Sequence, residues 1–66
     1  MIKILGPRRV GTEQPQQFEL VYRDFENASQ GYFQTTMYGT EAVLRVSLQK
    51  CEVAEVDINN LFQHAR

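Results

Sequence analysis

The sequence predicts an α+β fold in which a small three-stranded antiparallel sheet is followed by a C-terminal helical hairpin (β-β-β-α-α). Residues 1–5, 18–25 and 32–38 are short apolar or alternating runs bounded by turn residues, which is typical of strands. Residues 41–51 and 55–65 carry apolar side chains at helical spacing. The turn between these two segments is short, so the helices must be antiparallel neighbours or a bent pair.

The first strand is expected over residues 1–5, because Ile2 to Leu5 is a short apolar run that ends at Gly6-Pro7. No helix crosses such a turn pair. Residues 8–17 are polar, contain one glycine and one proline, and have no periodicity. We expect a long flexible loop there, and loops of that length in a compact domain are often functional or disordered.

The second and third runs are expected to pair as an antiparallel hairpin, since a short stretch with a glycine, residues 26–31, connects them. Alternation places three side chains of the second run on one face: Phe18, Leu20 and Tyr22. In the third run it separates Phe33, Thr35 and Met37 from Tyr32, Gln34, Thr36 and Tyr38.

The change from strand to helix is expected at Gly39-Thr40-Glu41. The Thr40 hydroxyl can cap a helix, and Glu41 suits its first turn because the helix dipole is positive there. A strand competes over residues 41–50, because Leu44 and Leu48 also fit an alternating pattern. The helix is favoured, since strong helix formers dominate the segment.

The last helix has the clearest pattern of the chain. Four apolar residues recur at i, i+3, i+4 and i+7: Ile58, Leu61, Phe62 and Ala65. With Ala54 as the N-cap, Val53 and Ile58 have the spacing of a hydrophobic staple. The predicted core comprises Phe18, Leu20, Phe33, Met37, Leu44, Leu48, Ile58, Leu61 and Phe62.

A chain of 66 residues is expected to form one small domain, residues 1–66. A core of this size supplies roughly 3–5 kcal/mol of net stability. Cys51 is the only cysteine, so no disulfide forms within the chain, and Cys51 with His64 is too small a ligand set for structural zinc. Self-association is the remaining way to add stability, and we therefore expect a homodimer.

The charge pattern disfavours nucleic acid as a partner. The net charge is −1, and residues 1–33 carry four cations and four anions. Neither half of the chain is a basic patch for phosphates. The N-terminal apolar run is too short for an export signal or a membrane span, and one free cysteine suits a reducing cytosol. A cytoplasmic location is therefore expected, with no membrane partner.

The residue pattern predicts no catalytic, cofactor-binding or metal-binding site. Cys51 and His64 are the only nucleophile and base candidates, and the predicted second helix separates them by about 15 Å. Glu55 and Asp57 diverge by about 160° around that helix, so they cannot act as an acid–base pair. We expect Cys51 to be a small core residue, His64 to be a rim residue, and the protein not to be an enzyme.

Apolar and aromatic residues away from the predicted core are the candidate partner or dimer surface. On the helical pattern Val46 and Val56 point away from the core, and an isolated exposed valine would need no explanation. The remaining candidates are Tyr32, Tyr38, Arg8 and Arg9. The leading functional hypothesis is a small cytosolic protein-interaction or regulatory module that forms a homodimer and holds an unknown protein. The alternative is a single-stranded nucleic-acid accessory protein that uses sheet tyrosines and arginines.

Overall fold

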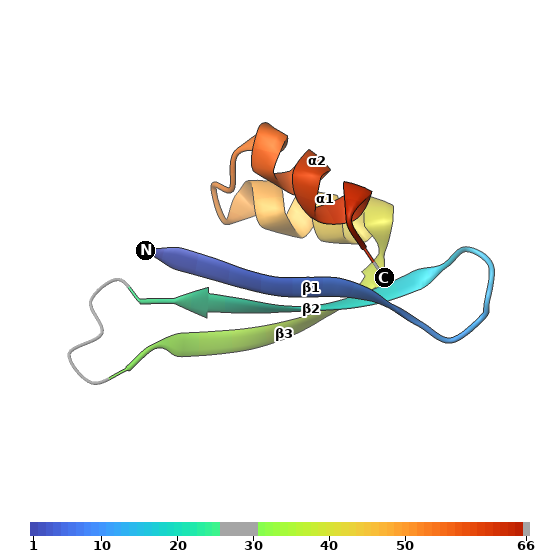
Figure 1. The fold of residues 1–66 in the computed structure, drawn as a ribbon, viewed down its shortest axis with the longest axis horizontal. Helices are drawn as coiled ribbons and strands as arrows, with labels where there is room; N and C mark the ends of the chain where they lie inside the picture. Colours follow the sequence, from blue (N-terminus) through green and yellow to red (C-terminus); the bar gives the residue numbers. More distant parts are fainter. Residues whose placement is uncertain (26–30, 66) are drawn as a thin grey trace.

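The computed structural model describes residues 1–25 and 31–65 and confirms the predicted order β-β-β-α-α. The elements are β1 (Ile2–Val10), β2 (Gln17–Asp24), β3 (Phe33–Thr40), α1 (Glu41–Lys50) and α2 (Glu55–Gln63). The strands form one antiparallel sheet in the order β1-β2-β3, so β2 is central and the other two are edges. Both helices lie over the same face of this sheet (Figure 1).

The first strand is longer than predicted. It does not end at Leu5 but continues through Gly6-Pro7 to Val10, with a register shift between Leu5 and Arg8. Pro7 is tolerated because β1 is an edge strand and the shift is a bulge, where a missing N–H costs no ladder bond. Gly6 takes a φ of 96°, which a side chain would disfavour.

The predicted loop over residues 8–17 is therefore wrong at both ends. Arg8 and Arg9 pair with β2, and Gln17 begins β2. Residues 11–16 form the connection, where the Gln16 side chain donates hydrogen bonds to the carbonyls of Val10, Gly11 and Gln17. The hairpin turn is predicted over residues 26–31. Of these, residues 26–30 lie outside the residues that the structure describes.

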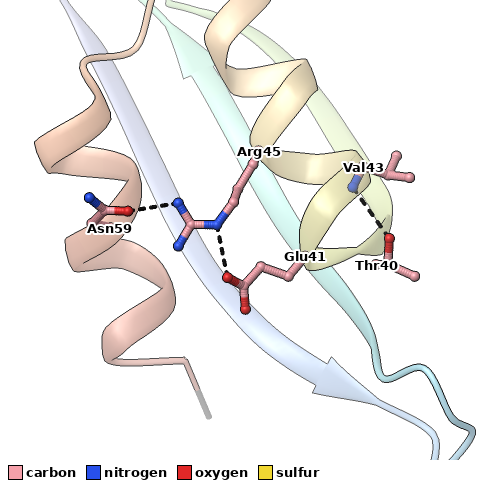
Figure 2. Close-up of polar contacts among 5 residues, drawn as sticks. All are labelled: Thr40, Glu41, Val43, Arg45 and Asn59. Atoms are coloured by element: carbon pink, nitrogen blue, oxygen red, sulfur yellow. Dashed lines mark hydrogen bonds and ion pairs between the residues drawn. The ribbon is translucent and has the colours of Figure 1, made fainter.

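The helical prediction for residues 41–51 is confirmed against the competing strand. Thr40 Oγ1 accepts a hydrogen bond from the Val43 backbone N–H at 3.3 Å, as expected of the N-cap (Figure 2). The helix ends in a Schellman motif, in which Val53 N–H bonds to Leu48 C=O and Glu52 N–H bonds to Gln49 C=O. Glu52 occupies the left-handed position of this motif with φ 64°. The second helix begins after Ala54, which provides no side-chain cap.

The core lies between the helices and one face of the sheet. Its buried side chains are Phe18, Leu20, Tyr22, Leu44, Leu48 and Ile58. Met37, Leu61 and Phe62 pack against it while partly exposed, as does Cys51. Phe33 is not in the core and is 69% exposed. It pairs with Asp24 in the last row of the sheet, and in Figure 1 this end of the sheet extends beyond the helices.

Candidate binding surfaces

The sheet has a helix-side face and an uncovered face, and the register assigns each strand residue to one of them. Phe18, Leu20 and Tyr22 face the helices, so Glu19, Val21 and Arg23 face away from them. Directly paired residues share a face of an antiparallel sheet. We define the open face as Glu19, Val21 and Arg23 of β2 together with the residues directly paired with them on β1 and β3, which are Lys3, Leu5, Arg8, Gln34, Thr36 and Tyr38.

At one end of the open face the Glu19 carboxylate interacts with two of the predicted site residues, Arg8 and Tyr38. Arg8 Nε lies 2.9 Å from Glu19 Oε1, and both side chains are at least partly solvated. Glu19 is also directly opposite Tyr38 on β3. A hydrogen bond to the Glu19 carboxylate and the repulsion between two negative charges raise the pKa of Tyr38 above its ordinary value of 10.0. Tyr38 is therefore a neutral phenol at physiological pH.

At the other end, Arg23 organises the surroundings of Tyr32. Its Nε donates to Gln34 Oε1 at 2.8 Å, and its guanidinium carbon lies 4.7 Å from the centroid of the Tyr32 ring. The Tyr32 ring is tilted against that of Phe25, with centroids 5.0 Å apart. Tyr32 and Tyr38 thus share a face, but a strand rise of about 3.3 Å per residue separates them by about 20 Å.

The structure does not bring the six predicted surface residues together. Arg9 pairs with Phe18 and so belongs to the helix-side face, away from Arg8 and Tyr38. Val46 and Val56 are 49% and 64% exposed on the helical layer, on the opposite side of the molecule from the open face. The prediction that both valines point away from the core is confirmed.

Charge is divided between the two sides of the molecule, although it balances along the chain. The open face carries three cations and one carboxylate: Lys3, Arg8, Arg23 and Glu19. The described helical segment 41–65 carries four carboxylates and two cations: Glu41, Glu52, Glu55, Asp57, Arg45 and Lys50. The sheet side is therefore positive and the helical side negative.

The two helices are joined by one arginine. Arg45 on α1 donates to Glu41 Oε2 at 2.8 Å and to Asn59 Oδ1 on α2 at 2.7 Å (Figure 2). Its guanidinium carbon also lies 5.2 Å from the centroid of the Phe62 ring. Through these contacts Arg45 links α1 to Asn59 and Phe62 on α2.

A groove of about 630 Å³ runs between α2 and the outer edge of β1, and the sequence did not predict it. We call it the edge groove. Its lining residues are Ile2, Ile4, Gly6, Glu52, Val53, Ala54, Asp57, Asn60, Leu61 and His64. Its volume is in the range of ligand-binding pockets. No spacing in the sequence indicated that β1 and α2 would approach each other from opposite ends of the chain.

One wall of the edge groove is an unpaired strand edge. Phe25 N–H donates to Met1 C=O at 2.8 Å, and hydrogen-bonded pairs alternate along an antiparallel ladder. Lys3 and Leu5 therefore direct their backbone groups to β2. Ile2 and Ile4 direct theirs outward, where β1 has no strand neighbour among the described residues.

In the part of the chain that the structure describes, no three His, Cys, Asp or Glu residues form a group that could hold a metal ion. His64 lies at the edge groove and is exposed, whereas Cys51 is half-buried at the end of α1. Within the same residues, neither helix has the length and apolar character needed to cross a membrane.

Comparison with models of known protein families, with curated proteins and with solved structures finds no match to this chain.

Proposed function

We propose that the protein is a small cytosolic module that acts by binding another protein and by pairing with a second copy of itself, with no catalysis of its own. The edge groove carries this proposal, because an apolar groove beside a free strand edge is a surface on which a peptide segment can add as a strand. The lone cysteine is compatible with a reducing compartment.

Self-association is assigned to the helical layer. Val43, Val46 and Val56 are each about half exposed or more, and a core this small gains stability from a second subunit. Sedimentation of the full chain at about 100 µM, far above the dissociation constant of a micromolar dimer, should give a mass close to twice 7.7 kDa.

Substitution tests this surface directly. Val46→Glu and Val56→Glu should each return the monomer, because a charge in an apolar contact is not compensated. Thr12→Glu in the β1–β2 connection is the matched control and should leave the dimer intact. A wild-type chain that sediments as a monomer at all concentrations would contradict self-association.

Single-stranded nucleic acid is the second candidate ligand, and one observation favours it. The register places Tyr38, Lys3, Arg8 and Arg23 on the same side of the sheet, and Tyr32 contacts Arg23. Aromatic rings and cations on one face can hold bases and phosphates. Three phosphate contacts give a slope of about −2 for log affinity against log salt concentration.

This alternative has its own test. Fluorescence anisotropy with a labelled oligothymidine at low salt should detect binding that Arg23→Gln weakens. Arg9→Gln is the matched control, since Arg9 lies on the helix-side face and should not contribute. Absence of any anisotropy change at low salt would exclude nucleic-acid binding by this surface.

A further inference from the structure

We propose that the edge groove binds an extended segment of a partner protein in which apolar and acidic side chains alternate, added as a fourth strand beside β1. The proposal depends on the function proposed above, since it names the class of partner that the module holds. Three features of the described residues carry it: an outward-facing strand edge, an apolar groove on one side of that edge, and an unneutralised cation on the other.

The strand edge supplies the main-chain contacts. The N–H and C=O groups of Ile2 and Ile4 point away from β2, and water is their partner unless another strand adds to the sheet. An added strand would form hydrogen bonds with both residues. Ile2 is 41% exposed, so an approaching backbone has access to this end of the strand.

The edge groove selects apolar side chains on one face of the incoming strand. Alternate side chains of that strand would point to the helix side, where Ile4, Val53 and Leu61 line the groove. Glu52 and Asp57 stand in the same lining. Acidic side chains on this face would be repelled, so the helix-side positions of the partner must be apolar.

The open face selects acidic side chains at the intervening positions. Lys3 lies directly opposite Arg23, a cross-strand pair of like charges that is destabilising by itself. Arg23 contacts Gln34 and Tyr32, whereas the Lys3 side chain has no ion pair among the described residues. A carboxylate on the incoming strand beside Lys3 would neutralise this pair.

Charge also argues against a second copy of β1 as the occupant. If Ile2 of one copy bonded to Ile4 of the other, Lys3 would face Lys3 across the new ladder. If Ile4 faced Ile4, Lys3 would meet Leu5 and remain without a counter-charge. A lysine on an edge strand is a common means of preventing such self-pairing.

The test uses labelled synthetic peptides and the full chain, with affinity measured by fluorescence anisotropy. The probe is the capped peptide VEVEVEVE, and the comparison peptides are VKVKVKVK and the block sequence VVVVEEEE. The first should bind more tightly than both others. Lys3→Glu should weaken its binding about fivefold and reverse the preference toward the lysine peptide, since an attraction of up to 1 kcal/mol is replaced by repulsion.

A backbone variant separates strand addition from simple charge attraction. Ile2→Pro removes an outward N–H without breaking a hydrogen bond to β2, so it should reduce affinity about tenfold with little change in melting temperature. Lys50→Glu, on α1 and outside the groove lining, is the charge-matched control and should leave affinity unchanged.

Several results would overturn the inference. Equal binding of the three peptides, no binding of any, or full binding by the Ile2→Pro variant would each do so. Conversion of a wild-type dimer to a monomer by Ile2→Pro would identify a second copy as the occupant. In that case self-association stands but uses the strand edge and not the valines. If instead the valine variants abolish a dimer while no peptide binds, the proposed self-association stands and only this partner assignment fails.

Discussion

Replacing Phe62 with alanine tests how α2 is held to the rest of the protein. The ring makes a T-shaped contact with Phe18, with centroids 5.6 Å apart and planes at 87°, and the Arg45 guanidinium carbon lies 5.2 Å from its centroid. Phe→Ala costs about 3–5 kcal/mol at a fully buried site. Because Phe62 is half-buried, we expect about 2–3 kcal/mol, of which the aromatic pair contributes about 1.

Urea unfolding followed by circular dichroism measures this cost. A chain of this size has an m-value of about 1 kcal/mol/M, so the midpoint should fall by about 2–3 M. This loss is most of the stability that such a core supplies. Phe62→Leu keeps apolar bulk but loses both aromatic contacts, and it should cost about 1 kcal/mol. An alanine variant with an unchanged midpoint would show that α2 does not pack on Phe18 as described.

Three further perturbations follow from particular residues. Glu52→Gly should stabilise the protein by about 0.5–1 kcal/mol, because glycine tolerates the left-handed conformation after α1. Glu52→Ala should not stabilise it, and thermal melts of the two variants measure the difference. Gly6→Ala should destabilise it by about 1–2 kcal/mol, since its φ is positive and an added Cβ would lie 3.1 Å from the Glu19 carbonyl, a loss that thermal melting would detect. Glu19→Gln should lower the pKa of Tyr38 toward 10.0, read as the ultraviolet titration step that Tyr38→Phe removes. Because the folded pKa is raised, the stability from this contact is fully present below about pH 10 and is lost as the pH rises through the folded pKa.

The local rules of the sequence were sufficient for the fold class. Thr40 as a cap and the i, i+3, i+4 repeat of Ile58, Leu61 and Phe62 are short-range signals, and the structure confirms the helices that they predict. The extent of β1 was not accessible in this way. Gly6-Pro7 has the local chemistry of a turn, and only pairing with a distant strand reveals that the pair forms a bulge within an edge strand.

The same limit explains the error at Phe33. Alternation placed it correctly on the face of Met37, but burial depends on where the helices end above the sheet. The helices are short, and the last row of the sheet extends past them (Figure 1). The edge groove was unpredictable for a related reason, since its walls come from β1 and α2, which are far apart in the chain and adjacent only in the folded protein.

The charge distribution shows most clearly why a binding surface cannot be predicted without the pairing register of the strands. By sequence halves the cations and carboxylates nearly cancel, which disfavoured any charged partner. In a strand, however, neighbouring residues face opposite sides, so Arg23 and Asp24 cancel in the count but not in space. The register gathers Lys3, Arg8 and Arg23 on the open face and leaves the carboxylates of residues 41–65 on the helical side. An acidic partner is therefore compatible with a net charge of −1, because it contacts only the positive face of the protein and the net charge of the whole chain does not decide its binding.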